Sequence, residues 1–244
     1  MSKEKFILQL KWAEMITPSV RHLAFERVDG VRLDFIPGQF ITIHFEAEGK
    51  PVRRSYSIAT IPGASDLIEF SAGHFPGGLA TELLFNLEVG QQLEATGPFG
   101  KLVLREEKPA RYIFVATSTG ITPFRSMMPE LARRMEKEGL SVIQLLGVQK
   151  RVDLLYQDEF LKFAKQHPQY QFQAHFSRES AENLESHEHI GYVQTAFEHL
   201  NLDPTKDVVY LCGNPNMIDE AFNKLKELGF DSQNIRREKY ISSN

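Results

Sequence analysis

The sequence has little cysteine, little net charge and no long apolar run, and each shortage excludes a class of protein. Its 244 residues include one cysteine, Cys212, so the chain has no internal disulfide and lacks the four thiolates of a plant-type iron–sulfur cluster. The 28 Lys and Arg residues are balanced by 32 Asp and Glu, without the basic excess typical of a nucleic-acid binder. No apolar run approaches the roughly 18 residues of a membrane-spanning helix. We therefore expect neither a nucleic-acid partner nor a membrane span.

A signal-peptide core is also lacking. Residues 6–12 mix apolar and polar side chains and are too broken for the apolar core of a secretory signal, so we expect a cytoplasmic protein. The 42% hydrophobic and 25% charged residues are ordinary for a globular chain that is long enough to bury a sizeable core.

The eight histidines show no spacing typical of a metal site. His187 and His189 are two residues apart and flanked by Glu185 and Glu188, which indicates a polar loop rather than a set of metal ligands. We expect no metal, so that the chemistry would come from ordinary side chains and an organic cofactor.

The two halves of the chain differ in their apolar pattern. Over residues 6–104, short stretches of alternating apolar and polar residues are separated by turn signals such as Pro37-Gly38 and Pro62-Gly63. Short strands at this spacing predict an antiparallel sheet that closes into a small β-barrel, interrupted by one helix at residues 79–86.

From about residue 111 onward, apolar strands alternate with helical segments. The expected strands are 111–117, 141–148, 172–177, 208–212 and 235–240, and the expected helices are 123–137, 153–167, 193–200 and 217–228. Strands that are apolar on both faces and alternate with helices predict a doubly wound α/β domain with a parallel sheet. A charged segment closed by Pro109 separates the two patterns, and we place the domains at 1–106 and 107–244.

A segment of small residues, Ala116-Thr117-Ser118-Thr119-Gly120-Ile121-Thr122-Pro123, joins the first expected strand of the second half to its helix. Its glycine lets a ligand approach the backbone, and the N–H groups at the start of the helix suit a pyrophosphate. It is neither a Walker A loop nor the three-glycine Rossmann fingerprint, and a plain strand-to-helix turn is the alternative interpretation.

Two segments of the first half have features of an anion site. In Arg53-Arg54-Ser55-Tyr56-Ser57-Ile58-Ala59-Thr60, alternation places Arg54 and Tyr56 on one face, which offers a bidentate grip on phosphate beside a ring surface. Pro76-Gly77-Gly78-Leu79-Ala80-Thr81 opens a helix with small residues. The alternative is an edge strand with solvated arginines.

A third segment, Val208-Val209-Tyr210-Leu211-Cys212-Gly213-Asn214-Pro215-Asn216-Met217, places Cys212 and Gly213 at the carboxyl end of a buried strand. Ligands of doubly wound sheets bind outside such ends. Taken alone, Cys212 is more typical of a small buried apolar residue than of a reactive group.

Taken in chain order, these segments resemble the ferredoxin–NADP⁺ reductase family of flavoproteins. The resemblance covers most of the chain, and the motifs follow the family's order near its spacing. They are Arg54-Ser55-Tyr56-Ser57, Gly78-Leu79-Ala80-Thr81, Gly97-Pro98-Phe99-Gly100, Thr119-Gly120-Ile121-Thr122-Pro123, Gly147 with Asp153-Leu154-Leu155-Tyr156, and Cys212-Gly213-Asn214-Pro215-Asn216-Met217. The resemblance implies an FAD-binding barrel, an NAD(P)-binding α/β domain and hydride transfer between the two cofactors, for which the protein chiefly supplies positioning.

The resemblance also implies roles for single residues. Arg54 would hold the flavin phosphates, Tyr56 would lie against the isoalloxazine ring, and Ser57 would hydrogen-bond near its N5 atom. The residues it assigns to the two cofactors are Arg54, Ser55, Tyr56, Ser57, Gly77, Gly78, Leu79, Ala80, Thr81, Thr117, Thr119, Gly120, Ile121, Thr122, Ser177, Arg178, Tyr192, Cys212, Gly213 and Asn214. Tyr56, Ser57, Cys212 and Tyr240 would be the catalytic residues, with Cys212 beside the nicotinamide and Tyr240 over the flavin face. A tyrosine packed on the last strand is the alternative for Tyr240, with Glu238 as a polar neighbour.

The chain departs from the family at two places. Thr117 and Ser118 stand where the family often has two glycines, and Gln149 stands where it often has arginine, with Lys150 and Arg151 following.

The pair Ser177-Arg178 favours NADPH over NADH, because arginine and serine together can bind a 2′-phosphate. The four carboxylates that follow favour NADH instead; they are Glu179, Glu182, Glu185 and Glu188. Tyr192 would stack on the adenine or pack under the loop.

We therefore expect a monomeric FAD enzyme that oxidises NADPH and passes single electrons to a separate ferredoxin or flavodoxin. An NAD(P)H–flavin reductase and the reductase component of an oxygenase are the enzymatic alternatives. A non-catalytic flavin or nucleotide sensor is the alternative outside enzymology.

Overall fold

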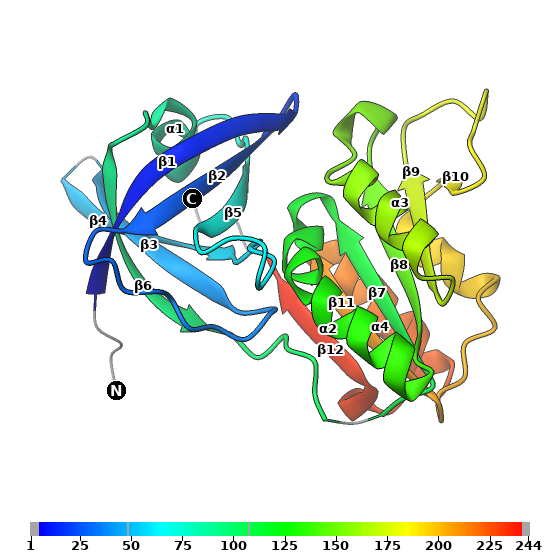
Figure 1. Cartoon of the computed structure of the whole chain (residues 1–244). Helices are drawn as coiled ribbons and strands as arrows, with labels where there is room; N and C mark the ends of the chain where they lie inside the picture. Colours follow the sequence, from blue (N-terminus) through cyan, green and yellow to red (C-terminus); the bar gives the residue numbers. More distant parts are fainter. Residues whose placement is uncertain (1–4, 48, 107, 241–244) are drawn as a thin grey trace. The chain divides into compact units, whose positions relative to one another are not determined.

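The computed structural model describes residues 5–47, 49–106 and 108–240 (Figure 1). Its contacts divide the chain into two compact units, which are described separately. The first contains the residues up to 104 together with 122–129, and the second contains 105–121 and the residues from 130 onward. No helix in the described part of the chain is long and apolar enough to cross a membrane.

The first unit is an antiparallel sheet of six strands in the order β4-β3-β6-β1-β2-β5. The strands are β1 (Lys5–Thr17), β2 (Val20–Arg27), β3 (Phe40–Ala47), β4 (Lys50–Ser57), β5 (Ile68–Gly73) and β6 (Gln92–Phe99), and the helix is α1 (Leu79–Asn86). The two outer strands also meet, since the Tyr56 ring of β4 stacks on Phe70 of β5 with centroids 4.8 Å apart. Directly after β4, the Ala59 N–H donates to the Glu69 carbonyl at 2.7 Å. The sheet therefore curls on itself, and the predicted antiparallel barrel is confirmed.

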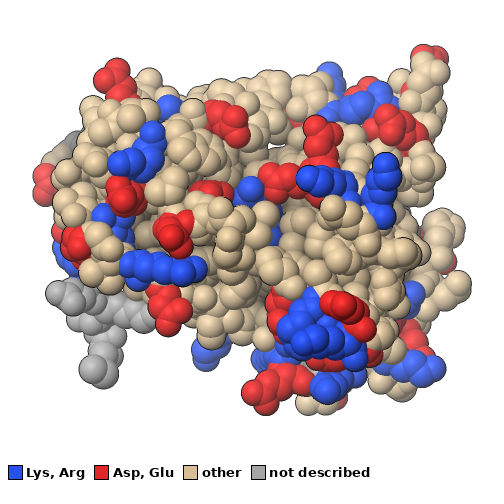
Figure 2. All heavy atoms as spheres, viewed as in Figure 1, with Lys and Arg blue, Asp and Glu red and all other residues tan. Residues whose placement is uncertain are grey.

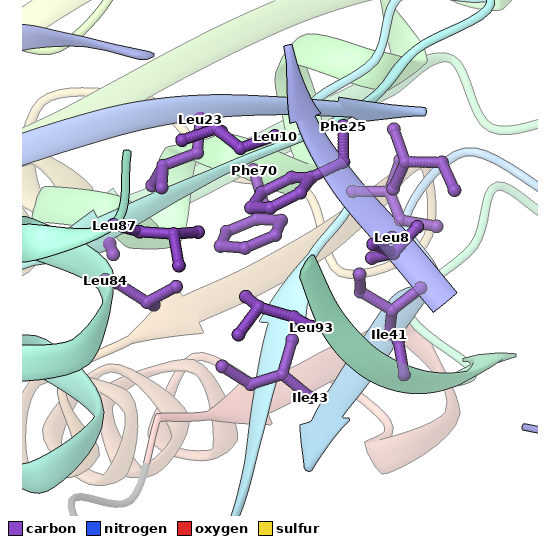
Figure 3. Close-up of a cluster of buried hydrophobic side chains, with 14 of the residues drawn as sticks. Leu8, Leu10, Leu23, Phe25, Ile41, Ile43, Phe70, Leu84, Leu87 and Leu93 are labelled. Carbon is purple, nitrogen blue, oxygen red and sulfur yellow. The ribbon is translucent and has the colours of Figure 1, made fainter. Parts of the chain in front are cut away.

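The barrel core contains apolar side chains from its strands and from α1 (Figure 3). Phe25 of β2 and Phe70 of β5 stack with ring centroids 5.2 Å apart, and Leu84 of α1 is fully buried against the same cluster. Each such side chain contributes about 1.5–3 kcal/mol through its burial. The core thus fixes α1 on the barrel by its last turn.

The second unit is a parallel sheet of six strands in the order β10-β9-β8-β7-β11-β12. Its strands are β7 (Arg111–Thr117), β8 (Ser141–Val148), β9 (Tyr170–Phe176), β10 (Glu188–Ile190), β11 (Asp207–Gly213) and β12 (Ile235–Lys239). The connections include α2 (Thr122–Glu138), α3 (Gln157–Gln166), α4 (Pro215–Glu227) and 3₁₀ turns at Ser118–Ile121, Arg151–Asp153, Val193–Glu198 and Ser232–Asn234. The predicted doubly wound domain is confirmed, and its strand order reverses between β7 and β11.

Two sequence predictions differ from the structure in this unit. The helix expected at 193–200 is a 3₁₀ turn, Val193–Glu198. The polar loop expected around Glu185 to His189 instead leads into the strand β10, in which the Glu188 side chain is fully buried. Glu188 tolerates burial because Arg151 donates two hydrogen bonds to its carboxylate, at 2.7 Å each.

Acidic and basic side chains are interspersed over the face of the molecule shown in Figure 2, in keeping with the near balance of the two signs in the sequence. Among the described residues, no group of three or more His, Cys, Asp or Glu side chains is arranged to hold a metal ion.

Candidate functional site

The carboxyl ends of β7 and β11, where the strand order reverses, are packed backbone against backbone. A Cβ built on Gly120 would collide with the Cys212 carbonyl and lie 2.9 Å from the Gly213 Cα. Gly213 has a φ of +123°, and a Cβ there would lie 2.8 Å from the Thr117 carbonyl oxygen. These two glycines allow the turn after β7 to touch the end of β11, at the edge where doubly wound sheets bind ligands.

Thr117 and Ser118 replace the family's two glycines in different ways. The Thr117 hydroxyl accepts a hydrogen bond from the Asn214 N–H at 2.8 Å, which ties the turn after β7 to the start of α4. Ser118 adopts a left-handed φ of +47°, a conformation that glycine reaches without strain. The Asn214 side chain caps α4, as it accepts from the Asn216 N–H at 2.8 Å.

The start of α2 is open to an anion. Its first residues continue directly from the 3₁₀ turn Ser118–Ile121, and no side chain caps the helix. Thr122 is buried, and its hydroxyl has no hydrogen-bond partner among the described residues. An unpaired buried hydroxyl at the start of an uncapped helix fits a nucleotide pyrophosphate.

Cys212 lies fully buried at the end of β11, opposite Glu238 of β12. Burial raises the pKa of the Cys212 thiol well above its ordinary value, the Glu238 charge adds to the rise, and a hydrogen bond with the Tyr240 side chain opposes it. The Tyr240 N–H donates to the Gly213 carbonyl at 2.8 Å. The predicted residues Cys212, Gly213 and Tyr240 are therefore neighbours at one edge of the sheet, and the thiol is neutral.

We expect the native protein to resist thiol reagents, because the thiolate is the reactive form and burial disfavours it. At pH 8, a chromogenic disulfide reagent should release one equivalent only after denaturant is added, since the chain has one cysteine. A full equivalent released within minutes from the folded protein would show that Cys212 is accessible and ionised.

In the barrel, Arg54 and Tyr56 lie on one face of β4, as the alternation predicts. They are paired with Ile43 and Ile41 of β3, both fully buried, whereas Ser55 faces the other side with its hydroxyl 3.0 Å from the Thr42 hydroxyl. Burial raises the pKa of Tyr56 to about 12, so its hydroxyl stays neutral at physiological pH. Arg54 is half-buried, and Ser57, at the end of β4, is buried.

The N-terminus of α1 is open to an anion while its C-terminus is satisfied. Gly78 occupies the N-cap without a side-chain hydrogen bond, and Gly77 before it has a left-handed φ of +74°. A Cβ on Gly78 would lie 3.0 Å from the Phe75 carbonyl oxygen, which favours glycine there. At the other end, Arg21 donates to the carbonyls of Leu84 and Phe85, at 2.8 and 2.7 Å. The N–H groups of the first turn, in Leu79, Ala80 and Thr81, are left to bind an anion, which fits the diphosphate of FAD.

The segment after β9 is fixed through its backbone, with Ser177 half-buried and the Arg178 side chain exposed. The Ser177 N–H donates to the Val148 carbonyl at 3.0 Å, and the Arg178 N–H donates to the Gln149 carbonyl at 2.9 Å. Arg178 is exposed. Tyr192 is 65% exposed, so its ring is not packed under the loop as the alternative interpretation expected.

Sequence reasoning missed the most heavily bonded residue near this segment. Arg151 binds Glu188 across the sheet edge and donates its own N–H to Glu179 at 3.0 Å. The only signal in the sequence is the cation pair Lys150-Arg151 after the glycine-containing strand, and nothing local indicates its partners.

Both halves of the chain match known domain families. Residues 7–104 match the oxidoreductase FAD-binding domain, and residues 114–222 match the oxidoreductase NAD-binding domain. The chain is also 31% identical over 245 residues to ferredoxin–NADP reductase B of Sorangium cellulosum, an alignment that covers 97% of this chain and 98% of that protein. The chain belongs to the ferredoxin–NADP⁺ reductase family. It is thus an oxidoreductase with an FAD-binding and an NAD-binding domain.

Other relatives are longer than the part that this chain matches. Terephthalate 1,2-dioxygenase reductase component 1 of Comamonas sp. is 27% identical over 242 residues, which cover 99% of this chain and 70% of that protein. A solved cytochrome P450 reductase from Amycolatopsis has the same fold, with a TM-score of 0.86 at 24% identity over 98% of this chain and 71% of that one.

Proposed function

We propose that this reductase-family protein oxidises NADPH with bound FAD and passes the electrons singly to a separate ferredoxin or flavodoxin. The observation that carries the proposal is the match to a ferredoxin–NADP reductase over nearly the whole of both chains. When bound, FAD supplies the chemistry, because it accepts a hydride and releases electrons one at a time. The remaining task of the protein is to bind and orient the two cofactors.

The barrel residues have the chemistry that FAD binding requires. Arg54 would grip the phosphates by charge-assisted hydrogen bonds, and the open first turn of α1, from Gly77 to Thr81, would hold the diphosphate. Tyr56 would lie against the flavin ring, with Ser55 and Ser57 of the same strand beside it. A neutral tyrosine hydroxyl and a half-buried ring support that assignment.

The residues assigned to NADPH lie at the carboxyl edge of the parallel sheet. Thr117, Thr119 and Gly120 to Thr122 would receive the pyrophosphate, and Cys212 to Asn214 would border the nicotinamide. Ser177 and Arg178 would bind the 2′-phosphate, and the exposed ring of Tyr192 would carry the adenine. The neutral thiol of Cys212 contributes a small apolar surface rather than a nucleophile. Tyr240 would cover the flavin.

A visible spectrum of the purified protein, titrated under argon with NADPH and with NADH, tests the proposal. We expect a yellow protein whose flavin band bleaches at lower NADPH than NADH concentration, and reoxidation when oxidised ferredoxin or flavodoxin is added. A folded preparation that stays colourless when supplied with FAD would contradict the proposal, and equal kcat/KM for both nucleotides would contradict its NADPH part.

Replacing Tyr56 with alanine is expected to weaken FAD retention and to slow reduction by NADPH, because the ring surface is lost. Tyr56→Phe is the matched control: it keeps the ring and removes only a hydroxyl that is neutral in the native protein. FAD content after gel filtration and the rate of anaerobic bleaching measure the effect. If Tyr56→Ala retained as much FAD as the unaltered protein, the Tyr56 ring would not lie against the flavin.

The reductase component of an oxygenase is a second candidate, favoured by the dioxygenase reductase among the relatives. It keeps the chemistry and changes only the acceptor, so rates with ferredoxin, flavodoxin and an oxygenase component separate the two. Loss of flavin on dilution would favour a flavin reductase, and negligible dye reduction by the FAD-loaded protein would favour a sensor. The domain limits 1–106 and 107–244, a monomeric state and a cytoplasmic location belong to the same proposal.

A further inference from the structure

Arg151, which follows β8, holds both ends of the acidic segment that follows β9. Its side chain donates two parallel hydrogen bonds to the Glu188 carboxylate, at 2.7 Å each, and its backbone N–H donates to Glu179 at 3.0 Å. A further bond reaches the Asn183 carbonyl at 3.3 Å. The Arg151 side chain thus fixes the end of the segment at Glu188, where β10 also pairs with β9, and the backbone N–H of residue 151 holds the start of the segment at Glu179.

Glu188 depends on this arginine for its charge. Its side chain is fully buried, and its second source of hydrogen bonds is the Glu185 N–H at 2.9 Å. The hydrogen bonds from Arg151 hold the pKa of Glu188 at about 2, so the carboxylate is ionised at neutral pH. Without Arg151, an uncompensated buried charge would remain, which a chain relieves by protonation or by moving the charge to solvent.

Glu179 is next to Arg178 in the sequence, but both of its carboxylate oxygens already accept hydrogen bonds from other residues. One carboxylate oxygen accepts from the Arg151 N–H at 3.0 Å, and the other accepts from the Ser180 N–H at 3.3 Å. The Arg178 guanidinium has no hydrogen bond or ion pair among the described residues, and its backbone is fixed to Gln149. Of the four carboxylates that favour NADH in the sequence, Glu179 and Glu188 are therefore bonded to residues other than Arg178.

We propose that Arg151 is a positioning residue for NADPH specificity: by binding Glu188 and fixing the segment 179–188, it keeps these carboxylates engaged and leaves Arg178 free for a 2′-phosphate. Arg151 itself does not contact the phosphate. The inference rests on the proposed use of NADPH and extends it to a residue outside the nucleotide site. Its physical basis is that a carboxylate released beside a 2′-phosphate repels a doubly charged group.

Binding of 2′-phospho-AMP and of AMP, measured by calorimetry without any need for flavin or acceptor, tests the inference. We expect Arg151→Gln to weaken binding of 2′-phospho-AMP about tenfold, or about 1.4 kcal/mol. AMP binding should stay unchanged, because AMP lacks the 2′-phosphate that a released carboxylate would repel. Arg178→Ala should abolish the preference. Lys150→Gln, which removes an exposed neighbouring cation, is the matched control and should change neither constant.

The double variant Arg151→Gln/Glu188→Gln separates positioning from direct contact. It removes the buried charge together with its partner, so it avoids the instability of an orphaned carboxylate. If Arg151 acts through Glu188, the double variant regains most of the lost affinity for 2′-phospho-AMP. If it remains as weak as Arg151→Gln, Arg151 acts by its own charge and the inference is overturned.

The steady-state counterpart is a rise in KM for NADPH in Arg151→Gln at unchanged kcat, with KM for NADH unaffected. Equal weakening of AMP and 2′-phospho-AMP would assign Arg151 a purely structural role. A preference of unchanged size in Arg151→Gln would refute this inference and leave the proposed function intact. A native protein without any preference for 2′-phospho-AMP would refute both the inference and the use of NADPH.

Discussion

Replacing Gly120 with alanine is expected to destabilise the protein by about 3 kcal/mol and to slow flavin reduction by NADPH about 100-fold. The added methyl group would meet the carbonyl of Cys212 and the Cα of Gly213, which are backbone atoms and cannot rotate away. The end of β11 must then move, and with it the residues assigned to the nicotinamide. Thermal unfolding and anaerobic stopped-flow bleaching measure the two effects.

Two glycine variants separate crowding from backbone strain. Gly63→Ala adds a methyl group at a φ of +84° with nothing within 4 Å, so it should lower stability by about 1 kcal/mol and leave reduction unchanged. Gly213→Ala combines a φ of +123° with a collision against Thr117, so its loss should exceed that of Gly120→Ala. If Gly120→Ala matched Gly63→Ala in both stability and reduction rate, the turn after β7 would not be in close contact with the backbone of β11.

Elements with a continuous pattern were the ones the sequence could predict. The helix expected at 79–86 and the strands expected at 111–117 and 141–148 coincide with α1, β7 and β8. The two strands are central in a sheet covered on both faces, so they are mainly apolar, with Gln144 the polar exception inside β8, and the apolar run alone identifies them.

Buried polar residues whose partners lie far away in the sequence could not be predicted. In β2, His22 is buried beside the Glu69 carboxylate of β5, 3.4 Å away. In β10, Glu188 is buried only because Arg151 lies 37 residues before it. A polar residue in a core is explained by its partner, and no local pattern names that partner.

In the candidate site, too, features with a local sequence signal could be predicted, and contacts between distant residues could not. Gly120 and Gly213 were predictable, because a glycine at the end of a buried strand marks a close approach of two backbones. The bond from the Asn214 N–H to the Thr117 hydroxyl joins residues 97 positions apart, and it explains why threonine serves where the family often has glycine. That contact was invisible until the strand order was known.

Arg54→Ala is expected to yield a colourless protein with an FAD affinity lower by about 100-fold, since charge-assisted hydrogen bonds to a phosphate contribute about 1.5–3 kcal/mol each to binding. Arg54 shares the face of Tyr56, and one of its guanidinium nitrogens donates to the Arg53 carbonyl at 2.8 Å, which holds the side chain in place before the flavin binds. A side chain already held in its binding position loses little entropy when the ligand binds. Removing Arg54 should therefore lose nearly all of the free energy that its contact with the FAD phosphates contributes.

Arg53→Ala is the matched control, because Arg53 is exposed on the opposite face and supplies Arg54 through its backbone carbonyl, which alanine retains. Fluorescence titration of the apoprotein with FAD gives the affinities, and the rise in unfolding temperature with added FAD gives an independent measure. Arg53→Ala should retain FAD and its thermal protection. Equal losses of FAD affinity in the two variants would indicate that the cofactor is attracted by general positive charge on β4. A loss confined to Arg54→Ala requires a specific contact between FAD and the face of β4 that carries Arg54 and Tyr56.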